Sequence, residues 1–402
     1  MRPLFICAAA AALSACSGSS ADLTDLAGNT GKREVVTAKY GDALPLTSAA
    51  ELQRHKDGEQ EFIRNRTGAQ GLGPVMTGIA CFACHDAPPA TGGTNQRIET
   101  RFGRRNPDGS FDELISLGGP MAQDEAIGKV NATTYVPEKV PPEANVVTGR
   151  RTTPLFGLGL VDATPDATFI AIAAWQLAHE GATAGRPAMV HDLVTGKTAV
   201  GRFGWKAVHP TLLQFNADAF VNEMGITNPL FPQENCPQGN CALLADNPSP
   251  GVNDPDGTAL NLVTDFTRFL GPPPRKTAGP ADGAATFKSI GCGACHLATL
   301  VTGTVPEPAL DQVAYHPYSD FLLHDMGTLA DGIDQGDAKG NEMRTQPLWG
   351  VAQQTRLLHD GRARNVSEAI LMHDGQGKAA RDRFSALSDP EKTALLAFIA
   401  TL

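Results

Sequence analysis

The amino-acid sequence predicts a mainly α-helical protein in which two similar helical units follow each other along the chain. One observation is a repeat, because Gly-x-x-x-Phe stands at 58–62 and again at 283–287. Each copy is followed by Cys-x-x-Cys-His, at 81–85 and at 292–296. A second observation is the run of three prolines at 272–274, through which no helix can continue.

Each unit is expected to start with a helix and to close with one. The Gly-x-x-x-Phe segment opens the first helix, and apolar residues recur with helical spacing at 260–270 and at 390–402. Residues 388–391 supply a capping box for the last helix, with Ser at the N-cap and Glu at the third helical position. Arg-Thr-x-Pro-Leu-x-Gly also occurs twice, at 151–157 and at 344–350.

These signals divide the chain into four parts. We expect a signal peptide at 1–15, an anchor linker at 16–50, a first domain at 51–274 and a second domain at 275–402. The first domain carries a large loop-rich insertion after Gly157.

The N-terminus reads as an export signal. Arg2 precedes a ten-residue apolar run at 4–13, which is too short to span a bilayer of about 30 Å. The run ends at Leu-Ser-Ala-Cys, which resembles the bacterial lipoprotein box with Cys16 as the acylated residue. A simple secreted protein is the alternative. We expect a lipoprotein on the periplasmic side of a bacterial membrane, with the outer membrane favoured because Ser17 does not resemble an inner-membrane retention signal.

The composition is that of an ordinary globular protein. Of the 402 residues, 42% are hydrophobic and 19% are charged, and the formal net charge is -10. An acidic chain is a poor partner for nucleic acid, so that class of function is excluded. The acidic surface suits solubility or docking to a basic donor protein.

The two Cys-x-x-Cys-His motifs predict covalently attached haem. Two thiols three positions apart can form thioethers with the two vinyl groups of haem, and the adjacent His supplies the fifth iron ligand. A zinc site needs four ligands, and a thioredoxin-like pair has no use for the His. We therefore expect two haem c groups and two cytochrome-c-like helical domains. The predicted attachment and iron ligands are Cys81, Cys84, His85, Cys292, Cys295 and His296.

The remaining cysteine pair is Cys236 and Cys241, which has no following His. In an oxidising compartment a small disulfide loop is the natural interpretation, with free thiols or a metal site as alternatives.

The sixth iron ligand decides what each haem does, since an open iron can bind peroxide or oxygen. His373 ends a short helical pattern at 366–372 and is expected to close haem 2, with Met372 as the neighbouring alternative. The matching slot for haem 1 falls near Asp218 or Ala217, and neither ligates haem iron well, so haem 1 is expected to be open. The residues that could still close it are His179, His191, His209 and Met224.

An open haem needs an acid–base group and a charge stabiliser on its reactive side. The candidates in the segment expected to form that face are Gln214, Glu223, His209 and Arg202.

From residue 151 onward the sequence resembles the bacterial di-haem oxidoreductases that are often labelled thiol oxidoreductase-like. These are relatives of the di-haem cytochrome c peroxidases and of the di-haem enzyme that matures methylamine dehydrogenase. The resemblance rests on Pro-Leu-Phe-Gly-Leu-Gly-Leu at 154–160, Gly-Arg-Phe-Gly-Trp-Lys-Ala at 201–207, and the segments 224–232, 317–327 and 359–364.

The resemblance implies a mostly helical fold with one haem per domain, and it shows departures. The peroxidases have Met, and the methylamine enzyme Tyr, in the slot that His373 occupies here, so haem 2 should have a lower potential than Met would give. Arg101 stands where the peroxidases carry a His that closes haem 1 at rest. The relatives often have an Asp- and Gly-rich loop before Gly-Arg-Pro. Residues 179–187 of this chain do not match it, so the resemblance does not support a calcium site there. His324 is expected to be structural, with ordering of the haem 2 propionates or binding of a metal between the domains as alternatives. Trp349 is expected to pack against haem 2, with an electron-relay role as the alternative.

The sequence thus predicts an electron-transfer oxidoreductase in which haem 2 relays electrons to a peroxidase-like haem 1. The expected partners are peroxide and a small cytochrome or cupredoxin. The alternatives are a non-enzymatic electron-transfer cytochrome with both irons six-coordinate, and a haem-based gas sensor.

Overall fold

The structure is a computed structural model that describes residues 32–86, 89–94, 97–275 and 279–402. The predicted signal peptide and the lipid site at Cys16 lie outside the described residues. Among the described residues, no helix has the length and apolar character needed to cross a membrane.

The prediction of a mainly α-helical fold is wrong. Helices make up 35% of the described structure and strands 16%, so the chain is a mixed α and β protein with several small sheets. The α-helices are α2 Ala49–Phe62, α3 Leu158–Asp162, α4 Asp166–His179, α5 Leu212–Met224, α6 Thr258–Phe269, α7 Ala281–Ser289, α8 Val366–Leu371, α9 Lys378–Ala386 and α10 Asp389–Ile399.

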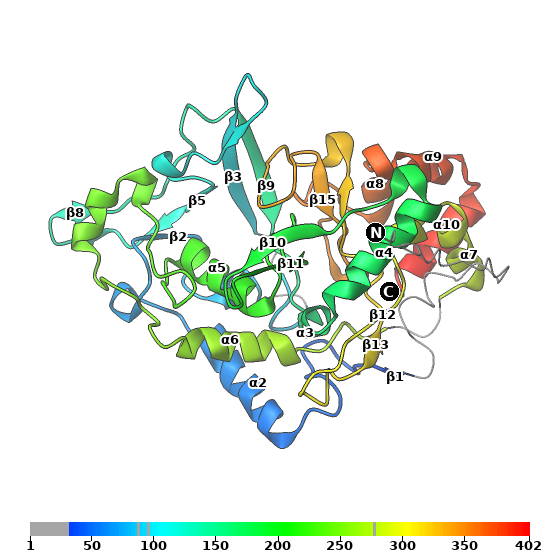
Figure 1. Ribbon diagram of the computed structural model, residues 1–402, viewed down its shortest axis with the longest axis horizontal. Coiled ribbons are helices and arrows are strands. Elements are labelled where there is room, and N and C mark those ends of the chain that lie inside the picture. Colours follow the sequence, from blue (N-terminus) through cyan, green and yellow to red (C-terminus); the bar gives the residue numbers. More distant parts are fainter. Residues whose placement is uncertain (1–31, 87–88, 95–96, 276–278) are drawn as a thin grey trace, which may run out of the picture.

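The strands are short and widely spread along the chain. They are β1 Arg33–Glu34, β2 Val75–Met76, β3 Ile98–Arg105, β4 Phe111–Asp112, β5 Met121–Ala122, β6 Glu125–Ala126, β7 Lys129–Val130, β8 Thr133–Thr134, β9 Val146–Arg151, β10 Ala188–Asp192, β11 Lys197–Gly201, β12 Leu300–Val301, β13 Val313–Tyr315, β14 Leu323–Asp325 and β15 Glu342–Arg344. The largest sheet joins β3 with β4, β5 and β9, and stands at the top of Figure 1.

The strands were not predicted because their side chains do not alternate regularly between apolar and polar. β3 reads Ile-Glu-Thr-Arg-Phe-Gly-Arg-Arg, and most of its residues are only partly buried. Its stability comes from antiparallel pairing with β9, which lies more than 40 residues away in the register Ile98 to Arg151. Such long-range pairing leaves little local signal in a sequence.

The repeated helix pair is present in both halves. α2 packs on α6 in the first half, and α7 packs on α10 in the second, where the helices α7 to α10 gather at one end of the molecule (Figure 1). Gly58 and Gly283 are the crossing points, because a Cβ at either one would come within 2.1 Å of a carbonyl oxygen, that of Leu262 or of Ala394. Gly58 lies near the end of α2 and does not open the helix as expected.

Two further local predictions hold. α10 begins with the predicted capping box of Ser388 and Glu391, and α6 occupies most of the predicted 260–270 segment.

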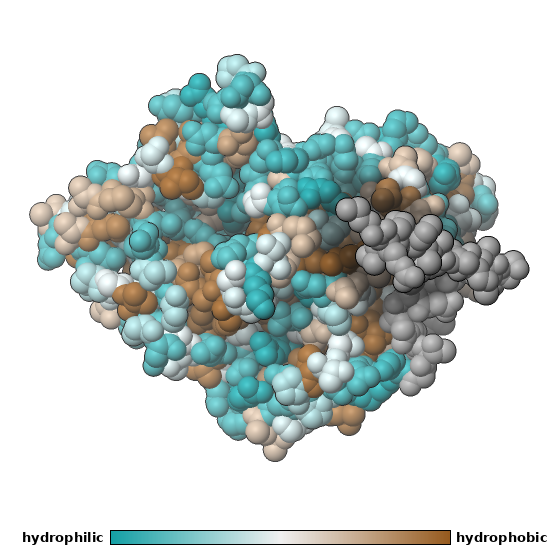
Figure 2. Space-filling view, viewed as in Figure 1, coloured by the Kyte–Doolittle hydropathy of each residue, from teal (hydrophilic) through white to brown (hydrophobic). Residues whose placement is uncertain are grey.

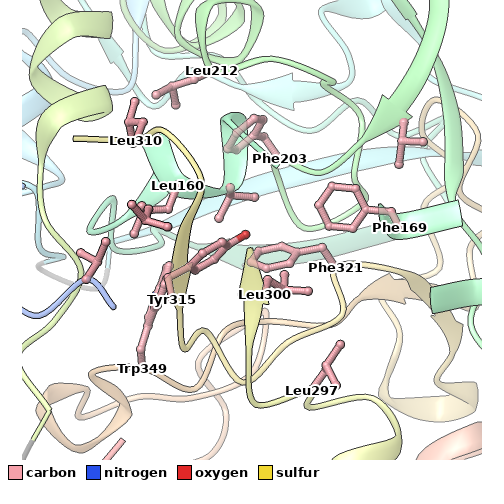
Figure 3. Packing of buried hydrophobic residues seen from close by; sticks show 14 of the residues in the cluster. Leu160, Phe169, Phe203, Leu212, Leu297, Leu300, Leu310, Tyr315, Phe321 and Trp349 are labelled. Carbon is pink, nitrogen blue, oxygen red and sulfur yellow. The ribbon is translucent and has the colours of Figure 1, made fainter. Parts of the chain in front are cut away.

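The two halves share one large hydrophobic core. Phe169, Phe203 and Leu212 come from the insertion, whereas Tyr315, Phe321 and Trp349 come from the second half, and these side chains gather in one cluster (Figure 3). Val35 and Leu44, from the segment predicted as a linker, belong to the same cluster. β1 also pairs in parallel with β13, so residues 33–44 are part of the folded body.

A charged clamp joins the halves beside this core. The acidic residues of this clamp lie at 331–342 in the second half, and each forms an ion pair with an Arg or Lys of the first half. Arg150 and Lys206 pair with Asp331, Arg105 pairs with Asp334, and Arg186 pairs with Asp337 and Glu342. The clamp fixes β9 of the first half against the second half. Elsewhere on the face seen in Figure 2, hydrophilic residues are interspersed with separate hydrophobic patches.

Candidate haem sites

The two Cys-x-x-Cys-His motifs fold in the same way. Cys81–Ala83 and Cys292–Ala294 each form one turn of 3-10 helix. The backbone N–H of His85 donates to the carbonyl of Cys81 at 3.0 Å, and that of His296 donates to the carbonyl of Cys292 at 2.9 Å. All four motif cysteines are free thiols, which thioether formation requires. Cys236 and Cys241, by contrast, are joined by a disulfide.

Both motif histidines are oriented as metal ligands. Nδ1 of His296 lies 2.9 Å from the carbonyl of Tyr318, and Nδ1 of His85 lies 3.2 Å from the carbonyl of Gly93. A carbonyl partner fixes the proton on Nδ1 and leaves Nε2 as the free ligand atom. Burial lowers the pKa of each histidine to about 4, so both imidazoles are neutral at pH 7, which is the form that binds a metal.

An aromatic ring repeats beside each motif. The ring of Phe62 lies 6.0 Å from that of His85, and the ring of Phe287 lies 6.5 Å from that of His296. The repeated Gly-x-x-x-Phe therefore has two structural roles. Its Gly allows two helices to cross closely, and its Phe packs near the motif imidazole.

A cavity of about 390 Å³ opens beside the second motif. Cys292, Cys295 and His296 line it together with His373, and much of the remaining lining is apolar, including Leu348, Ile370 and Ile399. This is the size range and character of a site for an organic cofactor. The residues present fit a haem, because thiols, a neutral imidazole and apolar walls meet in one cavity.

His373 lies in this cavity with its Nδ1 2.8 Å from the carbonyl of Ala369. It is close enough to His296 that a charge on His373 lowers the pKa of His296, after the larger effect of burial. His373 therefore has the same free Nε2 as His296 and shares its cavity. Met372 is the C-cap of α8, and 36% of it is exposed.

The face of the first motif carries a cluster of charges. Glu223, in the last turn of α5, acts on both Cys81 and Cys84, because its charge adds to burial in raising the pKa of each thiol to about 12. Burial, followed by the charge of Glu99, raises the pKa of Glu223 itself to about 8. Arg101 lowers it, and the Arg101 Nε lies 2.8 Å from Glu99 Oε1.

The other candidates for the reactive face have different surroundings. Gln214 holds the β10–β11 hairpin, since its Oε1 accepts the N–H of Leu193 at 2.9 Å. Arg202 forms an ion pair with Asp166 and lies 4.8 Å over the ring of Phe169, inside the large core.

His209 and Asp218 stand next to each other. The His209 Nε2 lies 3.4 Å from Asp218 Oδ2, so the residue in the predicted ligand slot is engaged by an imidazole. His179 and His191 are exposed. Arg101 and Glu99 also lie near the first motif, and the sequence did not indicate either as catalytic. Their place there depends on strand β3, which the sequence did not predict.

Two further residues of the second half contact the cavity. Nε2 of His324 lies 2.9 Å from Asp320 Oδ2, and its Nδ1 lies 3.5 Å from Cys295 Sγ. These three side chains could hold a metal ion, but thioether formation at Cys295 would take away one ligand. Trp349 is buried, lies 6.0 Å from Tyr315 and lines the cavity as packing.

One comparison with known proteins, the family model, agrees with two haem sites. A model of the family described as "Di-haem oxidoreductase, putative peroxidase" matches residues 124–402. No curated protein matches the chain. A solved structure of Kuenenia stuttgartiensis hydrazine synthase, pressurized with 20 bar xenon, is similar at 13% identity and a TM-score of 0.35, over 100% of this chain and 99% of that one.

Proposed function

The chain belongs to the di-haem oxidoreductase family, and from this premise we propose that it carries two covalently bound haem c groups and reduces peroxide at the first. Electrons reach the first haem through the second. The observation that carries the proposal is the contrast between the two motifs. A histidine pair shares the cavity of the second motif, whereas the half-buried Glu223 and the Arg101 guanidinium lie by the first.

Haem 2 is the relay. His296 and His373 both present a free Nε2, and two imidazole ligands leave no position for a substrate. Two protein ligands on a bound haem would suit it to electron transfer. The departure from Met at this slot favours a low potential for haem 2.

Haem 1 is the reactive centre. Glu223 is the acid–base group, because its pKa of about 8 allows it to gain and lose a proton near neutral pH. Arg101 is the charge stabiliser, and its ion pair with Glu99 holds it in place. When bound, a haem with an open position supplies the iron that binds peroxide and passes electrons to it.

The residues handle the protons of this reaction. Glu223 accepts a proton from the arriving peroxide and returns it to the departing oxygen, while Arg101 stabilises the negative charge between the two transfers. Two electrons from the donor and two protons from solvent complete the reduction of one peroxide to two waters.

The setting is the periplasmic side of a bacterial membrane. The lipoprotein box at Cys16 supports an acyl anchor, and the net charge of -10 supports docking of a basic small cytochrome or a cupredoxin as the donor.

The decisive experiment compares peroxide reduction by the haem-loaded protein and its Glu223→Gln variant, with a reduced small cytochrome as donor. Loss of the proton carrier should lower kcat/KM by about 100- to 10,000-fold, with the visible spectra of both haems retained. Glu138→Gln is the matched control, because the Glu138 carboxylate also has a raised pKa but binds the backbone N–H groups of Gln123 and Gln238. Equal rates in the two variants would remove Glu223 from the mechanism.

One observation favours a second candidate function, that of a non-enzymatic electron carrier. Met224 is buried and lines a small pocket together with Cys81. A thioether ligand from Met224 would close haem 1. Met224→Leu would then convert haem 1 from low spin to high spin, whereas under the peroxidase proposal its spin state stays as it is.

A further inference from the structure

Two arginines of the cavity beside the second motif are buried without an ion-pair partner among the described residues, although Glu180 also lines the cavity. Arg151 and Arg344 both line this cavity, and only 5% of Arg151 and 7% of Arg344 are exposed. Within the part of the chain that the structure describes, neither guanidinium forms an ion pair with Asp or Glu. This is unusual, since a buried charge costs several kcal/mol unless it is paired.

Backbone and amide groups satisfy only some of their donors. The Arg344 Nε donates to the carbonyl of Gly204 at 2.7 Å, and the Arg151 Nη2 donates to Gln354 Oε1 at 2.8 Å. These neutral acceptors do not cancel the charge. Accordingly, burial lowers the pKa of Arg344 to about 9 and that of Arg151 to about 10.

Two more polar atoms in the cavity have no partner. His359 is 2% exposed and its Nε2 is buried without a hydrogen bond among the described residues, and the same is true of the Gln346 Nε2. Both residues line the same cavity as the two arginines. Two cations and two unpartnered nitrogens in one cavity require a ligand that brings acceptors and negative charge.

The fold places this set where the two halves meet. Arg151 and Arg344 hold the same position in the repeated Arg-Thr-x-Pro-Leu-x-Gly segment, one in each half. Trp205 joins them, because its Nε1 donates to the carbonyl of Arg151 at 2.9 Å and its own carbonyl accepts the N–H of Arg344 at 3.0 Å. Its ring also lies 6.2 Å from that of His359.

We propose that Arg151, Arg344 and His359 form a carboxylate-binding edge that takes the two propionate groups of haem 2. Gln346 adds a fourth donor to this edge. The inference rests on the proposed binding of haem at the second motif. The match is one of chemistry, because the porphyrin is an apolar ring with two carboxylates on one side, and the cavity has apolar walls with two guanidiniums.

This edge adds to what the motif residues do. The thioethers and His296 fix one side of the cofactor, whereas the arginines fix the carboxylate side and contribute positive charge to the iron's surroundings. Because Arg151 comes from the first half, haem 2 would be held by both halves of the chain.

The test is a redox titration of the haem-loaded protein, read at the haem 2 signal. Positive charge favours the reduced iron, so Arg344→Gln should lower the ratio of reduced to oxidised haem 2 about tenfold at a fixed potential, a shift of 59 mV for a one-electron couple. Arg344→Lys should restore most of the ratio. Arg151→Gln tests the other half independently and should give a fall of similar size if Arg344→Gln does not fold.

The control is Arg383→Gln. Arg383 also lines the cavity, but it is exposed and its Nη1 donates to the carbonyl of Ile290, so solvent screens its charge. In Arg383→Gln the ratio of reduced to oxidised haem 2 should change less than twofold. If Arg151→Gln and Arg344→Gln behave like this control, the inference is overturned.

Two other outcomes are also decisive. If the haem 2 potential of the unaltered protein depends on added inorganic phosphate, and the dependence is lost in both variants, the edge binds a free anion and not the propionates. If the protein carries no haem, this inference and the proposed function both fail. A protein that holds two haems and shows the shift, but does not reduce peroxide, would overturn only the proposed function.

Discussion

Lys206 provides the most specific test of how the two halves are joined. Its ammonium group lies 2.8 Å from Asp331 Oδ1, and it donates to the carbonyl oxygens of Lys339 at 3.0 Å and of Glu342 at 2.5 Å. Both charged side chains are 0% exposed. All three of these oxygens belong to the second half.

The perturbation is Lys206→Met, which keeps the length and apolar stem of the side chain and removes the charge. Asp331 would keep Arg150 as its cation and the backbone N–H of Ile333 as a donor, and the carbonyl oxygens of Lys339 and Glu342 would lose the ammonium donor. Breaking one partner of a buried ion pair costs about 3–5 kcal/mol. Because burial lowers the pKa of Lys206 in spite of Asp331, the cost comes from the partners left behind and not from a strong attraction that is lost.

The assay is urea unfolding of the haem-loaded protein at pH 7. We expect the free energy of unfolding to fall by about 3–5 kcal/mol at an unchanged m-value. Lys378→Met is the control, since Lys378 and Asp382 form a pair that is 57% and 50% exposed, and its removal should cost less than about 0.5 kcal/mol. A loss below about 1 kcal/mol in Lys206→Met would refute the role of the clamp.

Three further predictions follow from the site and the fold. His373→Ala should convert the haem 2 signal from low spin to high spin in an electron paramagnetic resonance spectrum while haem 1 is retained. Glu234→Gln should raise the free energy of unfolding at pH 8 by about 1–3 kcal/mol, because burial raises the pKa of Glu234 to about 8 and its Oε2 has no partner among the described residues. Gly283→Ala should lower it by about 1–3 kcal/mol in urea unfolding, because the new Cβ would meet the Ala394 carbonyl at 2.1 Å.

Each of these predictions has an outcome that would contradict it. An unaltered haem 2 spectrum would remove His373 as a ligand. The sign for Glu234 follows from its raised pKa: its contribution to stability is full below the unfolded pKa of about 4.3 and is lost as the pH rises towards 8, so the two proteins should be equally stable near pH 4. If Glu234→Gln were still more stable than the unaltered protein near pH 4, the gain would not come from ionisation of Glu234. For Gly283, the control is Gly293→Ala, where nothing lies within 4 Å, and equal losses would argue against a close helix crossing.

The repeat was the part of the fold that the sequence predicted best. Gly58 and Gly283 recur because both helix pairs cross too closely for a Cβ, and a steric requirement of this kind leaves a fixed residue type at a fixed spacing. The capping box at Ser388 was readable for the same reason, since it depends on residues three positions apart.

The sheets and the reactive face were not readable in this way. Arg101 lies beside Glu223 only because β3 pairs with β9 and places its side chain near α5, and no local pattern encodes that pairing. Arg202 was a candidate because it lies in the segment expected to form the reactive face, but its guanidinium pairs with Asp166, which another helix supplies. Arg151 and Arg344 stand at the same position of a repeat that is visible in the sequence. Their role as a binding edge could be inferred only once the structure showed that both are buried.

The central claim is that haem 1 is open and haem 2 is closed by His373. The most direct test is a low-temperature electron paramagnetic resonance spectrum of the oxidised, fully haem-loaded protein, quantified per haem. The account predicts one high-spin and one low-spin signal in equal amounts, with the low-spin signal lost in His373→Ala. Two low-spin signals in equal amounts would show that both irons are closed at rest and would contradict the account.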